Sequence, residues 1–342
     1  KAWPNSAIRT IGSAISSWPV AVTNSAPVAL TWDVTDSLSE DGSLDIRAAF
    51  TDGTTTAYSS AHTITVDRNA GTPPSADVGP GSVNALTGDF TLSDTDASGF
   101  DLSVSRTASS RRPSAGSDAE GQVAIFGPQW TSGTTAEITD SDWAYIRRNS
   151  ATSVALVDAD GDETGFTATS AGGWKPEPGS EYLTLTGSLA GSFTLKDDEG
   201  TTTTFAKVDS AATTWQVAST YLATDNSTTK VVSEKPTPTS TLARPKYIIA
   251  PTSAVSPSTC ETTPSTKGCR VMEFVYATST TATSTALGDY NGQVKQIKEW
   301  ATDPGASAAT ATVVAQYSYD DSGRLREDWD PRISPALKTT YT

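Results

Sequence analysis

The chain has 342 residues, of which 36% are hydrophobic and 18% are charged, and its formal net charge is −15. It contains no apolar run close to the roughly 18 residues that a membrane-spanning helix needs. A chain with this net negative charge is not expected to bind nucleic acid unaided, because the phosphates attract a basic patch. These properties predict neither a membrane span nor nucleic acid as a partner.

The first 75 residues are predicted to form short antiparallel strands. Residues 43–50 and 63–67 alternate apolar and polar side chains, which is typical of a strand with one buried face. The run Val66-Asp67-Arg68 resembles the end of the last strand in bacterial immunoglobulin-like modules. This resemblance implies a small β-sandwich over residues 1–75. The only histidine, His62, is interpreted as an ordinary strand residue.

The next segment is dense in proline and glycine, which disfavour helices and central strands. We therefore predict a linker over residues 76–82. Residues 83–235 and 236–342 then alternate between short apolar strands and turns, and the segments 153–166 and 189–205 each predict a β-hairpin with Asp and Gly at its tip. Because almost nothing in the chain predicts a helix, we expect an all-β fold of consecutive antiparallel hairpins.

One hairpin tip places carboxylates at alternate positions, Asp158, Asp160 and Asp162. An EF-hand loop would need glycine at its sixth position and glutamate at its twelfth, where this sequence has Glu163 and Thr169. We therefore predict an acidic turn without a metal or other cofactor, and we keep a Ca²⁺ site as the alternative. The same interpretation, an acidic turn, applies to two further pairs, Asp94 with Asp96 and Asp140 with Asp142.

The chain has two cysteines, Cys260 and Cys269, and the loop between them contains Pro264 and Gly268. Paired cysteines in a secreted chain usually form a disulfide, so we predict one that closes this loop. The alternative is a pair of free thiols. A zinc site would need further ligands, and the only histidine is remote in sequence.

The most specific motif is Tyr-Ser-Tyr-Asp-Asp-Ser-Gly-Arg-Leu near the C-terminus, whose defining residues are Tyr317, Tyr319, Asp320, Gly323, Arg324 and Leu325. The two tyrosines are predicted to share one strand face, with a turn at Asp320–Gly323 and with Leu325 opening the return strand. The segment resembles a YD repeat of the RHS family. Residues 270–300 fit the same unit loosely, and residues 338–342 are expected to open the next one.

Three upstream segments occur in the order in which they precede the β-shell of that family. They are a strand around Thr87-Gly88, a strand around Arg106-Thr107 and the turn Phe126-Gly127-Pro128-Gln129-Trp130. The resemblance therefore covers residues 80–342. It implies a spiral β-sheet that closes into a hollow shell, in bacteria often around a C-terminal toxin. The motif of the family's self-cleaving core does not occur in this sequence, so we expect no catalytic residue.

The resemblance implies a non-catalytic part of a secreted or cell-surface bacterial protein that encapsulates, displays or delivers a C-terminal effector. Its partner would be the rest of the same polypeptide, and a start at Lys1 without an initiator methionine is expected for a processed piece. One alternative is an adhesin that binds cell-surface glycans, although tryptophans are predicted mainly to fill the core; the candidates are Trp130, Trp143, Trp174, Trp215, Trp300 and Trp329. Another is a secreted hydrolase, which would depend on His62 or on two close carboxylates.

Overall fold

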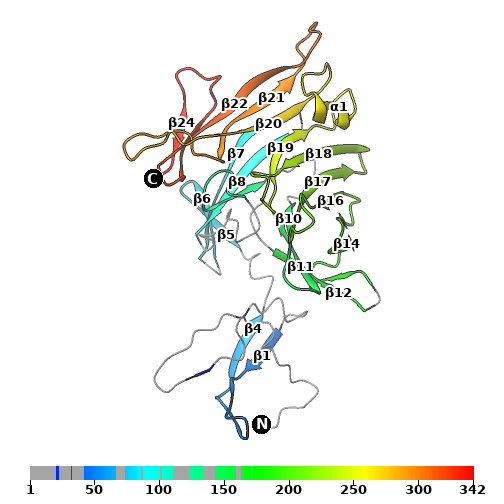
Figure 1. Ribbon diagram of the computed structural model, residues 1–342, viewed down its shortest axis with the longest axis vertical. Helices are drawn as coiled ribbons and strands as arrows, with labels where there is room; N and C mark the ends of the chain where they lie inside the picture. The colour runs from blue at the N-terminus through cyan, green and yellow to red at the C-terminus, as the bar shows by residue number, and fades with distance from the viewer. Residues whose placement is uncertain are drawn as a thin grey trace.

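The computed structural model describes residues 21–22, 32, 42–66, 74–85, 88–100, 102–110, 123–133, 143–158, 163–170 and 172–342, and the structural statements below concern these residues. Within them the protein is all-β, with antiparallel pairing throughout and one short helix (Figure 1). The strands form two small two-stranded sheets, a five-stranded sheet and a fifteen-stranded sheet. The predicted all-β class with antiparallel strands is thereby confirmed. No described helix has the length and apolar character needed to cross a membrane.

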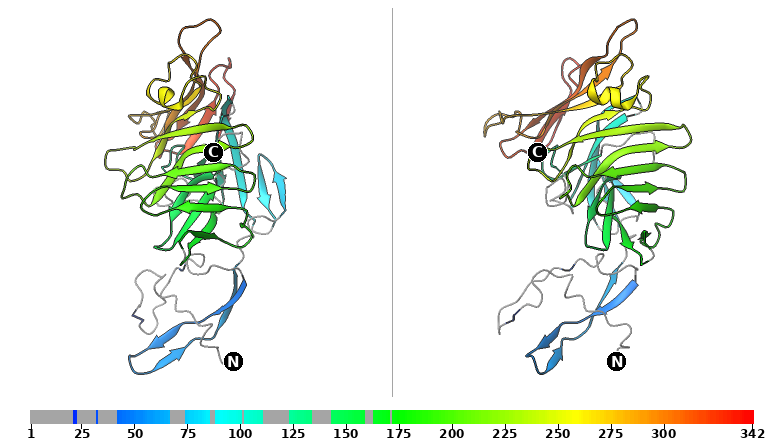
Figure 2. Two further views of the ribbon diagram at one scale, coloured as in Figure 1. Left: turned by 90° about the vertical axis from the view of Figure 1, so that its right-hand side faces the viewer. Right: turned by 45° about the vertical axis from the view of Figure 1, so that its right-hand side comes forward.

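The two small sheets lie in the N-terminal segment, at one end of the molecule (Figures 1 and 2). β1 (Gly42–Ile46) pairs with β4 (His62–Val66), and β2 (Ala49–Thr51) pairs with β3 (Thr56–Tyr58). The predicted strand 43–50 is thus interrupted after Ile46, and the predicted strand 63–67 corresponds to β4. His62 is an exposed residue of β4 opposite Ile46, in agreement with its interpretation as a strand residue.

The five-stranded sheet has the strand order β5–β6–β7–β8–β9. Its strands are β5 (Ser75–Val78), β6 (Gly81–Asn84), β7 (Phe90–Gly99), β8 (Leu102–Ser109) and β9 (Trp130–Gly133). Residues 76–82, predicted as a linker, instead form most of the β5–β6 hairpin. Gly79 has a φ of 60°, and with Pro80 it makes the two-residue turn that brings Val78 opposite Gly81. Proline and glycine therefore mark a hairpin turn here, because such turns need a residue with positive φ.

The fifteen-stranded sheet begins with β10 (Trp143–Arg148), β11 (Ser153–Asp158), β12 (Glu163–Ala168), β13 (Trp174–Pro176), β14 (Thr184–Gly187), β15 (Phe193–Lys196), β16 (Thr202–Ala206) and β17 (Thr214–Leu222). It continues with β18 (Ser227–Glu234), β19 (Arg244–Ile249), β20 (Val271–Tyr276), β21 (Val294–Ala301), β22 (Thr310–Tyr319), β23 (Leu325–Trp329) and β24 (Lys338–Thr340). From β17 to β24 each strand pairs with the next one in sequence, so the strands stack in chain order (Figure 2).

β17 is the branch point of this sheet. Its first residues pair with β10, its last residues pair with β18, and β16 lies along its other edge. Both predicted hairpins are present, because β11 pairs with β12 and β15 pairs with β16. At the tip of the second hairpin Gly200 has a φ of 92°, which explains why the turn needs glycine.

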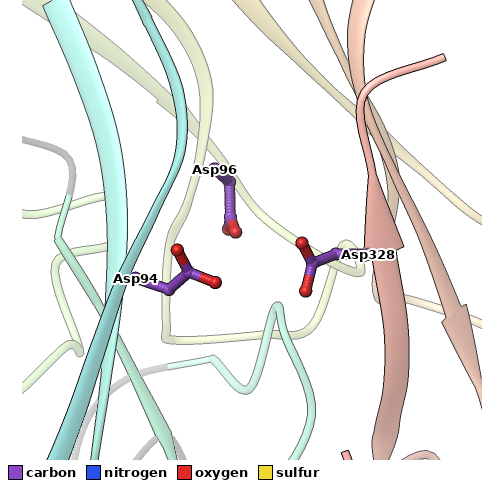
Figure 3. Close-up of side chains that lie close together, drawn as sticks. All are labelled: Asp94, Asp96 and Asp328. Carbon is purple, nitrogen blue, oxygen red and sulfur yellow. The ribbon is translucent and has the colours of Figure 1, made fainter. Parts of the chain in front are cut away.

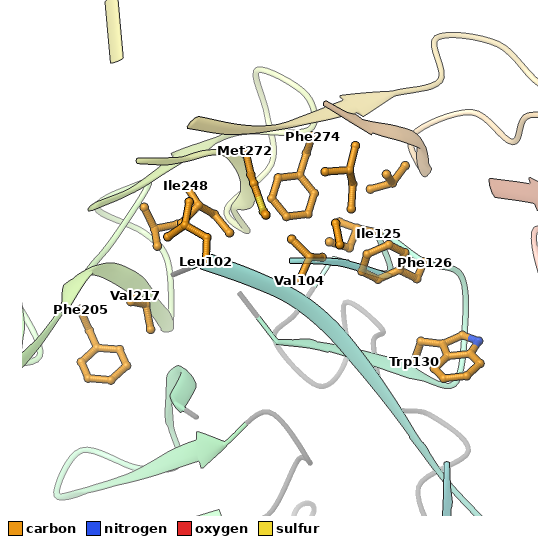
Figure 4. Packing of buried hydrophobic residues seen from close by; sticks show 14 of the residues in the cluster. Leu102, Val104, Ile125, Phe126, Trp130, Phe205, Val217, Ile248, Met272 and Phe274 are labelled. Atoms are coloured by element: carbon orange, nitrogen blue, oxygen red, sulfur yellow. The ribbon is translucent and has the colours of Figure 1, made fainter. Parts of the chain in front are cut away.

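The hydrophobic core lies where the five-stranded sheet packs against the large sheet (Figure 4). Leu102 and Val104 of β8 face Ile248 of β19 and Met272 and Phe274 of β20. All five side chains are buried. Leu102 and Val104 alternate with polar residues along β8. Because side chains two positions apart lie on the same face of a strand, Arg106 also points to the buried face.

Cys260 and Cys269 form the predicted disulfide. Cys260 lies on the short helix α1 (Pro257–Thr262), which begins after the capping residue Ser256. Both half-cystines are fully buried and form a second apolar cluster with Tyr247, Ile249 and Val271. The bond therefore holds the loop that connects β19 with β20 against the face of the large sheet opposite Met272.

We expect the double variant C260S/C269S to lower the free energy of unfolding by about 3 kcal/mol, because the bond removes loop-closure entropy from the unfolded chain. Urea unfolding of oxidised wild type and of the variant measures the difference. Ser258→Ala, on the exposed side of the same helix, is the matched control and should change stability by less than about 0.5 kcal/mol. Equal stabilities of wild type and double variant would contradict this role.

Candidate functional site

The most unusual polar group of the described chain is Arg106, a fully buried arginine on β8. Its direct partner across the β7–β8 pair is Asp94. The register of this pair shifts between Thr95 and Ala97, so Asp96 is the extra residue of a β-bulge. Asp96 lies two positions from Asp94, so strand alternation places both on the face where Arg106 lies, and the bulge brings Ala97 onto that face as well, opposite Val104.

Two further residues reach Arg106 from the opposite end of the chain. Asp328 lies on β23, and Tyr341 follows β24. The carboxylates of Asp94 and Asp96 from β7 and of Asp328 from β23 point toward one another (Figure 3). We call Arg106, Asp94, Asp96, Asp328 and Tyr341 the Arg106 cluster.

Arg106 makes hydrogen bonds to every other member of the cluster. Its Nε donates to both carboxylate oxygens of Asp96 at 3.0 and 2.9 Å. Its Nη2 lies 2.8 Å from Asp96 Oδ1, 3.1 Å from Asp94 Oδ2 and 2.8 Å from Asp328 Oδ1. It is also 2.8 Å from the Tyr341 hydroxyl oxygen. One guanidinium edge therefore holds three carboxylates and a phenol, which are strong, charge-assisted interactions.

Aromatic rings enclose the guanidinium. The Arg106 Cζ atom lies 4.3 Å from the ring centroid of Trp130 and 5.0 Å from that of Tyr341. The two rings meet edge to face, with centroids 5.5 Å apart. Cation–π contacts strengthen when they are desolvated, so Trp130 stabilises a charge that burial alone would disfavour.

Burial shifts the protonation equilibria of the cluster. It raises the pKa of Asp96 to about 6, although the Arg106 guanidinium opposes the change. Burial also raises the pKa of Asp328, again against the effect of Arg106. Burial on its own would lower the pKa of Arg106, but the Asp96 carboxylate outweighs it and keeps that pKa above its ordinary value. Arg106 therefore stays charged, whereas Asp96 is expected to titrate near pH 6.

The three carboxylates also have the spacing of a metal site, since one oxygen from each lies within 4.8 Å of the others. However, Arg106 Nη2 lies within 3.1 Å of an oxygen of all three. The positive charge between them is thus supplied by the chain, and a metal ion would have to displace it. The geometry fits an arginine-centred ion cluster that joins two sheets.

The interpretation of Asp94 and Asp96 as an acidic turn was wrong, because both residues lie within β7. Within this strand both carboxylates pair with Arg106. For the candidate Ca²⁺ loop, Asp158 is the last residue of β11, whereas Asp160 and Asp162 lie outside the described residues. The Ca²⁺ alternative therefore stays a prediction.

The YD motif forms the hairpin that its sequence predicts. Tyr317 and Tyr319 lie on β22 and are buried together with Leu325 at the start of β23. In the turn, Asp320 accepts hydrogen bonds from the backbone N–H groups of Ser322 and Arg324 at 2.9 and 3.0 Å. Gly323 has a φ of 76°, and Arg324 is exposed.

Two tyrosines, Tyr276 at the end of β20 and Tyr319 at the end of β22, each bond to the backbone of the preceding hairpin. Tyr319 donates its hydroxyl proton to the backbone oxygen of Val294 at 2.6 Å, and Tyr276 donates to that of Pro245 at 2.5 Å. The Gln293 amide also donates to the backbone oxygen of Gly323 at 2.8 Å. Residues 270–300, which fit the unit loosely in sequence, thus use the same contact as the full YD motif.

Tyr319→Phe removes one such contact without changing the packing. We expect the free energy of unfolding to fall by about 1–2 kcal/mol, because the buried carbonyl of Val294 loses its hydroxyl donor. Chemical denaturation against Tyr182→Phe measures the effect, since Tyr182 is exposed and its hydroxyl should contribute nothing measurable. A loss no larger than that of the control would contradict the contact's role.

The Phe126–Trp130 turn and the residue before it contact the first residue of β21 and the YD hairpin. The Ile125 backbone oxygen accepts from the Val294 N–H at 2.8 Å, and the Phe126 and Tyr317 rings lie 5.3 Å apart. A Cβ atom on Gly127 would lie 2.5 Å from the Gly323 backbone oxygen, so this approach requires glycine. The structure thus brings the upstream turn and the YD motif together, a contact that the sequence did not predict.

The candidate tryptophans are mostly internal. Trp130 and Trp215 are buried, and the others are half-buried, namely Trp143, Trp174, Trp300 and Trp329. Indole N–H groups of Trp174 and Trp215 donate to backbone oxygens, and that of Trp300 donates to the Glu273 carboxylate. This placement agrees with their predicted role in the core.

Sequence reasoning missed the Arg106 cluster, although one signal was available. Arg106 follows Leu102 and Val104 at the same alternation, so it occupies a core-facing position of its strand. A charge at such a position requires buried partners of opposite charge. Nothing in the pattern says that one of them is Asp328.

We compared the chain with protein-family models and with curated proteins, and neither comparison gave a match. The interpretation of the site therefore depends on its geometry.

Proposed function

We propose that this chain is a non-catalytic structural part of a secreted or cell-surface protein of the RHS/YD-repeat type. An immunoglobulin-like module over residues 1–75 would precede the stacked hairpins of a β-shell. The shell would encapsulate, display or deliver a C-terminal effector, and its partner would be the rest of the same polypeptide.

The repeated attachment of successive hairpins carries this proposal. The hairpins β18–β19, β20–β21 and β22–β23 are neighbours in one sheet. In two successive units a tyrosine hydroxyl bonds to the backbone of the preceding hairpin. Successive units that each attach to the neighbouring unit are characteristic of repeat architectures. This supports a sheet that extends by adding further units of the same kind.

The disulfide supports a location outside the cytoplasm, and the Arg106 cluster supports a structural role. The disulfide joins two fully buried cysteines, and stable disulfides are typical of oxidising compartments. In the Arg106 cluster the carboxylates are held by Arg106 and Tyr341. These contacts position the five-stranded sheet relative to β23 of the fifteen-stranded sheet.

Electron cryomicroscopy of the natural secreted gene product tests the proposal. We expect further Tyr-Asp hairpins that extend the sheet beyond β24 and surround a C-terminal segment. Limited proteolysis should then leave that segment intact for as long as the shell is folded. A C-terminal segment that is cleaved at the rate of an unfolded peptide, or a sheet that ends at β24, would refute the shell.

A further inference from the structure

The Arg106 cluster contains more negative than positive charge. Asp94 and Asp96 come from β7, Asp328 comes from β23, and the one cation is Arg106 of β8. The other titratable groups that face the cluster are phenols, Tyr341 after β24 and Tyr317 and Tyr319 of β22. With all carboxylates ionised, two negative charges remain without a counter-charge among these groups.

The bonded donor atoms of the cluster carry too few protons for the acceptors around them, while Arg106 Nη1 is buried without a hydrogen-bond partner. Arg106 offers one proton from Nε and two from Nη2, and these face both oxygens of Asp96, one oxygen each of Asp94 and Asp328, and the Tyr341 oxygen. The single hydroxyl proton of Tyr341 lies 3.0 Å from Asp94 Oδ2 and 2.8 Å from Asp328 Oδ1. It can be donated to only one of them at a time. One added proton would therefore supply a missing donor and remove one repelling charge.

We propose that the Arg106 cluster is a proton-binding clasp, which takes up one proton between neutral and mildly acidic pH and thereby tightens the attachment of β23–β24 to β7–β8. The proton is shared among carboxylates that lie too close for all three to be ionised at low cost. Its binding site spans residues that are more than 200 positions apart in sequence. Proton uptake is thus coupled to the contact between the five-stranded sheet and the C-terminal hairpin.

The direction of the pH effect follows from Asp96, whose pKa burial raises to about 6 from 3.8. The folded protein then binds more protons than the unfolded chain between pH 6 and pH 4, so this group adds stability as the pH falls through 6. The gain is complete below the unfolded pKa. Asp96 is the best candidate for the protonated group because its side chain is the least exposed of the three carboxylates.

Urea unfolding of wild type and Asp96→Asn at pH 7.5 and pH 5.0 tests the clasp. Between these values the folding equilibrium constant of wild type should rise about tenfold relative to that of the variant. Asp330→Asn is the matched control, because Asp330 pairs with Arg332 in an exposed turn and its pKa is lowered. That variant should keep the wild-type pH profile. Parallel profiles of wild type and Asp96→Asn would refute the proposal.

Two measurements keep the test decisive if Asp96→Asn fails to fold. The infrared band of a buried, protonated carboxylic acid should appear in wild type as the pH falls from 7.5 to 5.0. It should be shifted to lower pH in Asp328→Asn, because that change removes a negative charge that raises the pKa of Asp96. Backbone amides of β23 and β24 should also exchange more slowly at pH 5.0, after correction for the intrinsic rates. Absence of the band in wild type would overturn the clasp.

Discussion

Replacing Arg106 by methionine is expected to lower the free energy of unfolding at pH 7.5 by about 3–5 kcal/mol, because removing one partner of a buried ion pair leaves the others uncompensated. Methionine keeps most of the volume beneath the Trp130 ring, so the loss isolates the charge. Asp96, whose side chain is 1% exposed, would lose its only cationic hydrogen-bond partner among the described residues. Urea denaturation followed by tryptophan fluorescence measures the change.

Two comparison variants sharpen this expectation. Arg332→Met removes an arginine that pairs with Asp330 and is half exposed, and it should cost less than about 1 kcal/mol. Arg106→Lys should be nearly as harmful as Arg106→Met, because lysine cannot place the Nε and Nη2 donors of a planar fork on several carboxylates. If Arg106→Met were as stable as Arg332→Met, the cluster would not hold the sheets together.

Replacing Trp215 by alanine is expected to lower the free energy of unfolding by about 3–5 kcal/mol, the usual cost of removing a buried aromatic side chain. Trp215 is fully buried on β17, the strand at which the large sheet branches. Its ring meets Phe193 edge to face at 4.9 Å, and its indole N–H donates to the Gly191 backbone oxygen at 2.7 Å. Calorimetric and urea unfolding of the variant measure the loss.

Trp329→Ala is the matched control for Trp215→Ala. Trp329 is only half-buried, and the Lys338 ammonium nitrogen lies 4.3 Å from its ring centroid. Its removal should therefore lower the free energy of unfolding by about 1 kcal/mol. Similar losses of unfolding free energy for the two variants would mean that the buried packing of Trp215 on β17 does not stabilise the sheet more than an ordinary half-buried tryptophan does.

The hairpins were predictable because their signals are local. Alternation in residues 153–166 and the Asp-Asp-Ser-Gly turn of the YD motif each act within a few positions, and the structure contains both hairpins. The disulfide was predictable for the same reason, since its two cysteines lie close in sequence. Short-range chemistry thus suffices for the all-β class and for individual turns.

Contacts between remote segments could not be predicted in this way. The pairing of Arg106 with Asp328 joins positions 222 residues apart, and strand alternation carries no information about such a partner. The bulge at Asp96 could not be predicted either, because a bulge shifts the alternation of buried and exposed positions by one residue. The proline and glycine of residues 76–82 were misjudged because the same residues serve linkers and tight turns.

The Arg106 cluster sets the order in which this chain can reach its final state during synthesis. Its first members, Asp94 to Arg106, leave the ribosome 222 to 247 residues before Asp328 and Tyr341. At roughly 5–20 residues per second this interval lasts on the order of ten seconds or more. During it Arg106 lacks Asp328 and Tyr341, two of the four side chains that form hydrogen bonds with it. The β23–β24 hairpin therefore completes an ion cluster whose first residues were made more than 200 positions earlier.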